Sequence, residues 1–92
     1  MKYTIKPTSQ FKRDLKLMKR RGCDRKTIED VIGTLAEGRK LDPKYLDHDL
    51  TGNWKGCREC HIAPDWLLVY QIFETDLILS LVRTGSHSDL AF

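Results

Sequence analysis

Residues 53–66 run Asn53-Trp54-Lys55-Gly56-Cys57-Arg58-Glu59-Cys60-His61-Ile62-Ala63-Pro64-Asp65-Trp66, and this stretch decides how the second half of the chain folds. It predicts a strand from Trp54 to His61, a tight connection over 62–65 and a second strand that begins at Trp66. The stretch contains a histidine, a carboxylate and two basic residues within a dozen positions, and His61 and Asp65 lie at the mouth of the hairpin. Side chains that can transfer protons gather in this way at catalytic sites.

The remainder of the C-terminal half predicts a compact set of strands. Trp66–Phe73 is apolar on both alternating faces, which is typical of a central strand covered by helices on one side. A turn at 74–76 leads to a third strand over 77–83, and 84–87 leaves the sheet. Upstream, residues 41–52 have turn chemistry at both ends and predict a loop.

The N-terminal half predicts a strand followed by two helices. Residues 2–6 alternate polar and apolar side chains and stop at Pro7. Thr8 or Ser9 caps the first helix and Gly22 ends it. Its apolar stripe consists of Phe11, Leu15 and Met18, widened by Leu17.

The second predicted helix lies between an N-cap at Asp24 and a closing Gly38. Its apolar residues recur at helical spacing and are Ile28, Val31, Ile32, Leu35 and Ala36. The order β-α-α-β-β-β predicts a single α+β domain over residues 1–92, with an N-terminal strand and a two-helix hairpin packed on a largely antiparallel sheet.

Composition excludes several classes of protein. No run of about 18 apolar residues is present, so no membrane span is predicted. The N-terminus has no apolar segment of the kind a secretory signal requires. Three cysteines, an odd number, without an export signal favour reduced thiols in the cytoplasm over a disulfide framework.

Charge is unevenly distributed along the chain. Residues 1–40 hold twelve Lys and Arg against five Asp and Glu, a balance of +7, whereas residues 41–92 hold four against eight, a balance of −4. A basic half of this kind favours a polyanionic partner, because phosphate contacts need Lys and Arg. The alternative is a solvated helix face. On the first helix the basic residues are Lys12, Arg13, Lys16, Lys19 and Arg20.

The connection lengths bring distant polar residues together. Three strands joined by short turns run up, down and up, so His61, Asp65 and residues 83–87 share one edge of the sheet. Strands lie about 4.8 Å apart, which separates the outer two by roughly 10 Å. All three histidines of the chain, His48, His61 and His87, lie in or beside loops. Together with Asp65 and Arg83 they predict a catalytic site.

The segment Cys57-Arg58-Glu59-Cys60-His61 also spells the C-x-x-C-H pattern of a haem attachment site. In a strand, however, Cys57 and His61 face one side of the sheet and Cys60 faces the other. Haem attachment and zinc binding require the two sulfurs to converge. We therefore expect the cysteines to act as small apolar residues, and we predict neither a metal nor another cofactor.

Several segments together resemble one family. They are Leu50-x-Gly52-x-Trp54-Lys55-Gly56-x-Arg58 with His61, then Pro64-Asp65-Trp66-Leu67-Leu68-Val69-Tyr70, then Arg83-Thr84-Gly85-x-His87. This pattern closely resembles the YafQ branch of the RelE/ParE superfamily of bacterial toxins. The resemblance implies a RelE-like fold, entry into the A site of the 70S ribosome and endoribonuclease cleavage of mRNA. It also implies an inhibitory cognate antitoxin that forms a hetero-oligomer with the toxin.

The resemblance also implies the functional positions. It places His48, His61, Asp65, Trp66 and His87 at them, whereas the family's C-terminal phenylalanine, four residues after the last histidine, is here Ala91 with Phe92 next to it. For metal-free cleavage through the ribose 2′-OH we expect His87 as general acid, and His61 with Asp65 as general base and orienting partner. The remaining expected roles are His48 as a second base or phosphate contact, Arg83 and Arg58 as phosphate contacts, and Trp66 with Phe92 as base-stacking residues.

Two other functions remain as alternatives. A ParE-like toxin has the same fold and inhibits gyrase by protein binding, and it would not need histidines and an aspartate at one edge. A nucleic-acid-binding module without catalysis would explain the basic N-terminal half but would leave the histidines without a role.

Overall fold

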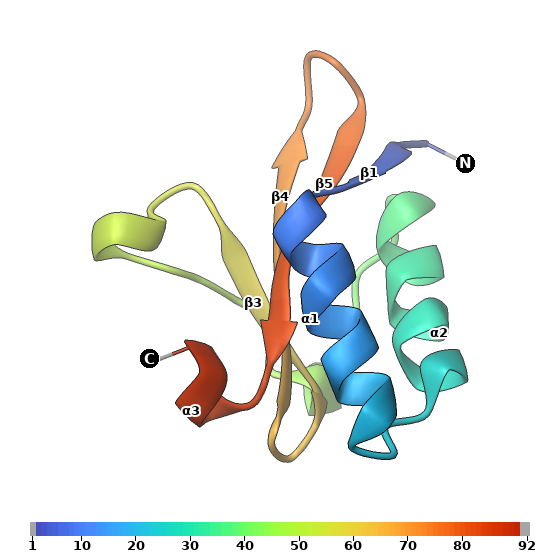
Figure 1. Ribbon diagram of the computed structural model, residues 1–92. Helices are drawn as coiled ribbons and strands as arrows, with labels where there is room; N and C mark the ends of the chain where they lie inside the picture. The colour runs from blue at the N-terminus through green and yellow to red at the C-terminus, as the bar shows by residue number, and fades with distance from the viewer. Residues whose placement is uncertain (1, 91–92) are drawn as a thin grey trace.

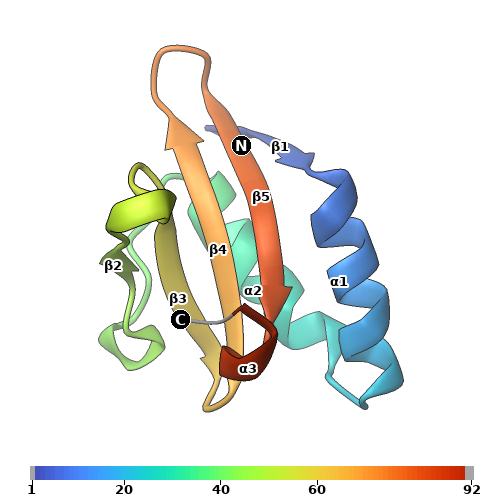
Figure 2. The same cartoon turned by 60° about the vertical axis from the view of Figure 1, so that its left-hand side comes forward.

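The computed structural model describes residues 2–90 of the chain. Its five strands form one sheet in the order β1-β5-β4-β3-β2, with β1 parallel to β5 and the other neighbours antiparallel (Figures 1 and 2). The elements follow in the order β1 (Thr4–Pro7), α1 (Ser9–Arg20), α2 (Arg25–Ala36), η1 (Pro43–Tyr45), β2 (His48–Asp49), η2 (Gly52–Trp54), β3 (Arg58–Ala63), β4 (Trp66–Phe73), β5 (Ile78–Gly85) and α3 (His87–Leu90), where η denotes a 3-10 helix.

The two long helices cover one face of the sheet, and α3 lies on the other (Figure 1). Side chains between α1, α2 and the sheet form the large core, which includes Phe11, Ile28, Leu68 and Tyr70. A smaller cluster on the opposite face joins Leu67, Val69 and Leu90. The predicted α+β class and the position of β4 in the interior of the sheet are confirmed.

The helix ends follow the predicted capping chemistry. Thr8 is the N-cap of α1, because its Oγ1 accepts a hydrogen bond from the Phe11 N–H at 3.0 Å. Asp24 caps α2 by accepting from the Lys26 N–H at 3.0 Å. Gly22 turns the chain between the helices at φ +89°, a conformation that glycine adopts without steric cost.

Two predictions in residues 41–61 were wrong. The strand expected from Trp54 begins only at Arg58, because 52–54 form η2 and Gly56 turns the chain at φ +96°. The expected loop over 41–52 contains β2, in which His48 pairs with Glu59. A strand of two residues gives no readable alternation, so the sequence pattern did not indicate it.

The buried stripe of α1 includes a carboxylate that was not expected there. Asp14 is 8% exposed, whereas Leu17, which we expected to widen the apolar stripe, is 41% exposed. Strand β1 pairs with β5 only as far as Leu81, and beyond that point Asp14 accepts a hydrogen bond from the Thr84 N–H at 3.2 Å. Asp14 therefore supplies the acceptor that a longer β1 would have provided to β5.

Candidate active site

Three histidines lie in a row on the sheet face opposite the long helices, and we call them the histidine row. The ring centroids of His48 and His61 are 6.4 Å apart, and those of His61 and His87 are 5.5 Å apart. The three residues come from β2, β3 and the start of α3. The predicted convergence of distant histidines at one part of the sheet is confirmed.

Asp65 forms its hydrogen bonds with His87 and not, as we expected, with His61. One carboxylate oxygen, Oδ1, accepts from the backbone N–H of His87 at 3.0 Å and lies 2.7 Å from its ring Nδ1. The hydrogen bonds from the backbone and the side chain of His87 lower the pKa of Asp65. The turn before β4 and the start of α3 meet at this edge, which brings the two residues together. Asp65 therefore fixes a proton on Nδ1 of His87 and leaves Nε2 for a substrate.

The start of α3 is held in place by a second carboxylate. Asp89 accepts from the Ser86 N–H at 2.9 Å, while Ser86 Oγ accepts from the Asp89 N–H at 3.2 Å, which is a reciprocal capping box. Arg21 at the end of α1 forms an ion pair with Asp89 and lowers its pKa. A Cβ at Gly85 would lie 2.9 Å from Cβ of Asp89, so a side chain at this position would displace α3. These contacts set the position of His87.

The sequence analysis missed a carboxylate at the other end of the histidine row. Glu59 is 5% exposed and pairs across the strands with His48, whose Nε2 lies 3.6 Å from Glu59 Oε1. Within residues 2–90, neither Oε2 of Glu59 nor Nδ1 of His61 has a hydrogen-bond partner, and both atoms are buried. Residues 59 and 61 share a strand face, so the alternation of side chains could have placed Glu59 beside the histidines.

Arg58 lies on the wrong face of the sheet for the phosphate contact that we expected. It pairs with Tyr70 of the large core and forms ion pairs with Asp47 at 3.3 Å and Asp49 at 2.6 Å. Burial opposes its positive charge, but the hydrogen bonds and charges of Asp47 and Tyr70 together outweigh burial and raise the pKa of Arg58. His61 lies three positions after Arg58, and this odd spacing directs the two side chains to opposite faces.

The prediction that Trp66 stacks on a base was wrong. Trp66 is 4% exposed and packs in the large core beneath the helices. Its Nε1–H donates to Thr84 Oγ1 at 2.9 Å, and Thr84 donates in turn to the Leu67 carbonyl at 2.6 Å. Because no face of the indole is open to a ligand, Trp66 supports the join between β4 and β5.

Arg83 is directed to α1, and within residues 2–90 its side chain forms hydrogen bonds with Asp14 and with no member of the histidine row. Its Nε donates a hydrogen bond to Asp14 at 2.7 Å, and its Nη2 donates another at 3.2 Å. The guanidinium of Arg83 is therefore paired with the carboxylate of Asp14. Burial raises the pKa of Asp14, but the hydrogen bonds from Arg83, Gln10 and Thr84 outweigh burial and lower it. Phe92, the second expected stacking residue, lies outside the described residues.

The two cysteines of the C-x-x-C-H pattern face opposite sides of the sheet, as predicted. Cys60 is fully buried in the large core, whereas Cys57 packs against the smaller cluster. Burial raises the pKa of the Cys60 thiol to about 12. In the described part of the chain, no group of three or more His, Cys, Asp and Glu residues is placed to hold a metal ion. These sulfurs therefore cannot attach a haem together.

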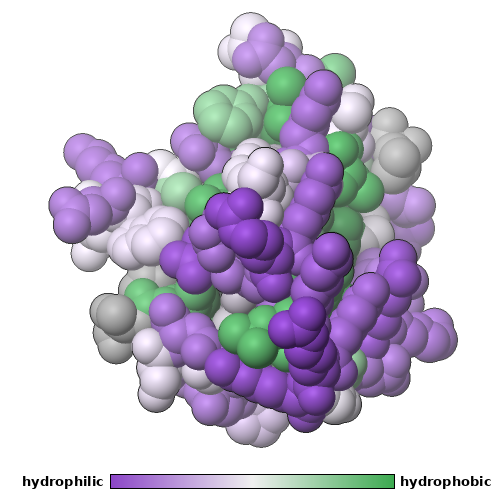
Figure 3. Space-filling view, viewed as in Figure 1, coloured by the Kyte–Doolittle hydropathy of each residue, from purple (hydrophilic) through white to green (hydrophobic). Residues whose placement is uncertain are grey.

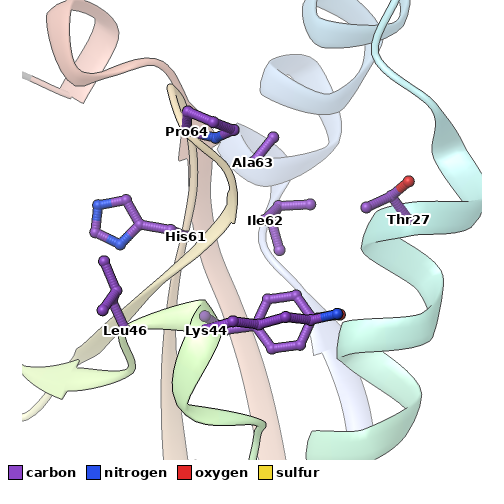
Figure 4. A pocket seen from close by; sticks show the side chains of 8 residues that line it. Thr27, Lys44, Leu46, His61, Ile62, Ala63 and Pro64 are labelled. Atoms are coloured by element: carbon purple, nitrogen blue, oxygen red, sulfur yellow. The ribbon is translucent and has the colours of Figure 1, made fainter.

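A pocket of about 570 Å³ opens beside the middle of the histidine row (Figure 4). Its walls come from β3, η1 and the start of α2, and it is lined by Thr27, Lys44, Tyr45, Leu46, His61, Ile62, Ala63 and Pro64. In Figure 4 the His61 ring lies on the side of β3 away from Thr27. A cavity of this volume is in the range that holds small organic ligands.

The fold and the histidine row define a small bacterial toxin of the RelE-like type. Residues 3–92 match the model of a family described as "Bacterial toxin of type II toxin-antitoxin system, YafQ". The chain belongs to this family.

Individual relatives agree with that membership. The chain is 37% identical to the mRNA interferase toxin YafQ of Escherichia coli K12 over 87 residues, which cover 94% of this chain and 92% of the relative. It is 49% identical to a metal-bound toxin from Helicobacter pylori, with a TM-score of 0.90 over 96% of this chain and 98% of the other. It is 35% identical to a chain of the E. coli DinJ–YafQ complex, with a TM-score of 0.87 over 96% and 97% of the two chains.

Proposed function

We propose that this protein is the toxin of a type II toxin–antitoxin system and that it cleaves ribosome-bound mRNA with the histidine row. The observation that carries the proposal is the placement of three imidazoles within 6.4 Å of their neighbours, with Asp65 hydrogen-bonded to the outermost one. Related toxins of this family are mRNA interferases, which supports RNA as the substrate.

Two of the histidines supply the proton transfers. Nδ1 of His61 is buried, so Nε2 is the nitrogen that can reach a substrate and remove the proton of a ribose 2′-OH. The 2′-oxygen then attacks the adjacent phosphorus, and the bond from phosphorus to the 5′-oxygen breaks. His87, whose ring Nδ1 lies 2.7 Å from Oδ1 of Asp65, donates its Nε2 proton to that leaving oxygen.

The histidine row argues against the two alternative functions. A toxin that inhibits gyrase by binding needs a complementary surface, and its function does not require imidazoles that lie in a row with a carboxylate partner. A non-catalytic nucleic-acid-binding module likewise needs cations and aromatic side chains. Histidine residues that can exchange protons near neutral pH are needed for cleavage.

The basic face of α1 supports the proposed partners. Lys12, Arg13, Lys16, Lys19 and Arg20 are all exposed, and hydrophilic side chains run along the helix in Figure 3. Exposed cations of this kind bind RNA phosphates, and they also suit an acidic antitoxin. A YafQ chain of E. coli is found in complex with DinJ, which supports a hetero-oligomer with an antitoxin here.

No helix within residues 2–90 is long and apolar enough to cross a bilayer. Because the proposed target is mRNA on the ribosome, we place the protein in the cytoplasm.

Cleavage of programmed ribosomes tests the proposal. Purified protein is added to 70S ribosomes that carry an mRNA with a defined codon in the A site, and the RNA is mapped by primer extension. We expect a cut within the A-site codon, no cut in the same mRNA without ribosomes, and protection when the cognate antitoxin is added first. Intact mRNA in the presence of folded wild-type protein would overturn the proposal.

A further inference from the structure

The pocket of about 570 Å³ beside His61 has no part in the proton transfers described above. It lies along the outer edge of β3, because β2 pairs with residues 58 and 59 only and leaves the rest of that edge without a strand neighbour in the described part of the chain. A pocket of this volume has room for a base with its sugar. Since His61 belongs both to the pocket and to the histidine row, a ligand here is continuous with a substrate at the row.

The charge of the lining suits a nucleotide better than that of two other pockets does. Within residues 2–90 it includes the cation Lys44 and no carboxylate. A pocket on the helical side is lined by Asp42 and Asp47, and one beside η2 is lined by Asp49, and these carboxylates repel a phosphodiester. Lys44 is exposed, and its Nζ lies 5.2 Å from the centroid of the Tyr45 ring. Its charge can therefore reach a phosphate at the mouth of the pocket.

An exposed leucine lies at the rim of the pocket. Leu46 is 60% exposed, the largest value among the exposed large apolar side chains of residues 2–90. It follows η1 with a left-handed backbone, φ +50°, where glycine or asparagine is usual. In Figure 4 its side chain lies on the same side of β3 as the His61 ring. A ligand that covers Leu46 supplies the burial that this side chain lacks in the free protein.

A nucleobase is the ligand that fits these features. Single-stranded RNA presents unstacked bases to a protein, and apolar side chains pack on their faces. Leu46 and Pro64 provide apolar surface at exposed positions of the lining. Trp66, from which we expected the stacking contact, is buried in the large core, so among the described residues a base contact must come from elsewhere.

We propose that the pocket binds the nucleobase of the nucleotide on the upstream side of the cut, with Leu46 packed on the base and Lys44 near a backbone phosphate. The inference rests on the proposed function, in which His61 acts on the 2′-OH of that same nucleotide. His61 lines the pocket, whereas His87, which serves the leaving oxygen of the next nucleotide, does not. Leu46 is then a substrate-binding residue that contributes to the choice of the base before the cut.

Leu77 provides a matched control for Leu46. It is also a leucine with a left-handed backbone, at φ +54°, and it is 46% exposed. It lies in the turn between β4 and β5, which extends away from α3 (Figure 2). Truncation of either side chain to alanine removes exposed apolar surface and leaves the two apolar clusters intact, so both variants should fold.

Single-turnover cleavage of ribosome-bound mRNA with abasic nucleotides tests the proposal. Leu46→Ala should slow cleavage about 5–30-fold, in the lower part of the range for losing a side chain that stacks on a base, and Leu77→Ala should stay within about twofold of wild type. Removal of the upstream base should slow the wild type by a similar factor, but Leu46→Ala by less than about twofold, because the contact is already absent. Removal of the downstream base should affect both proteins equally. An upstream base whose removal costs the same in both proteins, or coupling of Leu46 to the downstream base, would overturn the proposal.

Binding of an uncleavable ligand tests the pocket without ribosomes. The probe is a dinucleoside monophosphate with a 2′-deoxy upstream sugar, added at millimolar concentration to nitrogen-15-labelled protein. We expect the amide signals of Leu46 and Ala63 to shift and that of Leu77 to stay, and the shifts should disappear when the probe lacks its upstream base. Lys44→Gln should weaken binding, whereas Lys6→Gln, an exposed lysine at the opposite edge of the sheet, should not. Shifts that do not depend on the upstream base, or no shift at Leu46 and Ala63, would contradict the proposal.

The two proposals fail in different ways. If the wild-type protein did not cleave ribosome-bound mRNA, the proposed function would fall, while the titration with the uncleavable probe would still decide the pocket. If the wild-type protein cleaved and Leu46→Ala responded to the upstream base as the wild type does, only the assignment of the pocket would be wrong. Thermal melts of each variant separate loss of folding from loss of function.

Discussion

At the scale of single residues, the two carboxylates of the site differ in their surroundings. Asp65 is exposed and takes two hydrogen bonds from one residue, His87, which lower its pKa. Glu59 is buried and approaches its histidine at 3.6 Å. The first contact is already formed in the free protein.

The first prediction concerns His87 as the general acid. His87→Ala should lower single-turnover cleavage about 10²–10⁴-fold, which corresponds to roughly 3–5.5 kcal/mol of activation free energy. His87→Gln should be nearly as slow, because an amide keeps a hydrogen bond but delivers no proton at neutral pH. Ser88→Ala on the next position of α3 is the matched control and should cleave normally.

Stability and antitoxin binding of these variants should stay near wild type, because His87 is exposed and lies outside both apolar clusters. Near-wild-type cleavage by folded His87→Ala would remove this residue from the acid role and transfer the role to His61 or His48.

Which site residues the sequence could identify depended on strand geometry. Connection lengths placed His61 and His87 at one edge, and the structure confirms that they meet. The functional position of His48 came from the family resemblance, and its ring lies beside that of His61. Trp66 was misplaced because a tryptophan beside a catalytic edge can face either the core or a ligand, and the alternation over 66–73 does not say which side is solvated. Arg58 was expected beside His61, but the two residues are an odd number of positions apart on one strand, so their side chains face opposite sides of the sheet.

At the scale of elements, Asp14 joins α1 to the free part of the β5 edge. It accepts from the Thr84 N–H and from two nitrogens of Arg83. The sequence pattern favoured Leu17 for the buried stripe, because a periodicity argument counts apolar residues and cannot anticipate a carboxylate with a partner on a distant strand. Capping signals at Thr8, Asp24 and Gly22 were readable because they depend on neighbours in sequence.

The second prediction tests that join by stability. Asp14→Asn should lower the free energy of unfolding at pH 7 by about 1.5–3 kcal/mol, the range for hydrogen bonds that involve a charged group. The exposed Asp30 of α2, paired with Lys26, is the matched control, and Asp30→Asn should change stability by less than about 0.5 kcal/mol. Urea unfolding by circular dichroism measures both.

The pH dependence of this effect has a definite sign. The pKa of Asp14 is lower in the folded state than its ordinary value of 3.8, so its contribution is complete above pH 3.8 and disappears as the pH falls through the lowered value. Wild type and Asp14→Asn should therefore approach equal stability in strong acid. A stability difference that stayed constant from neutral pH to strong acid would contradict the ionised state of Asp14.

At the scale of the whole molecule, the sheet separates the basic face of α1 from the histidine row. The basic face of α1 lies on the helical side, and the histidine row lies on the side that carries α3 (Figures 1 and 3). The uneven charge of the sequence, +7 in residues 1–40, already indicated the basic face.

The third prediction is that cleavage needs no metal and that the protein carries no haem. In the proposed mechanism the histidine row provides both proton transfers, and the Cys57 and Cys60 sulfurs face opposite sides of the sheet. Cleavage should survive chelation under conditions that keep ribosomes intact, and purified protein should show no Soret band. A related toxin from H. pylori is found with bound metal, so elemental analysis belongs in the same experiment. Loss of cleavage on chelation, restored by one metal, would contradict this prediction.

The fourth prediction concerns the order of events in a growing cell. Induced expression of the toxin should reduce incorporation of labelled amino acids before incorporation of labelled thymidine, because the proposed target is mRNA on the ribosome. Co-expression of the antitoxin should restore growth. Arrest of DNA synthesis before protein synthesis would replace the RNA-cleaving function with the gyrase-binding alternative.

The chemistry of the cut ends tests the central claim most directly. Attack by the 2′-oxygen, with proton transfer by His61 and His87, leaves a 2′,3′-cyclic phosphate on the upstream fragment and a 5′-hydroxyl on the downstream fragment. Mass spectrometry of fragments from ribosome-bound mRNA should show these ends, and a 2′-deoxy substitution at the cleaved nucleotide should abolish the cut. Fragments with a 3′-hydroxyl and a 5′-phosphate, or an undiminished cut at the 2′-deoxy nucleotide, would contradict the account.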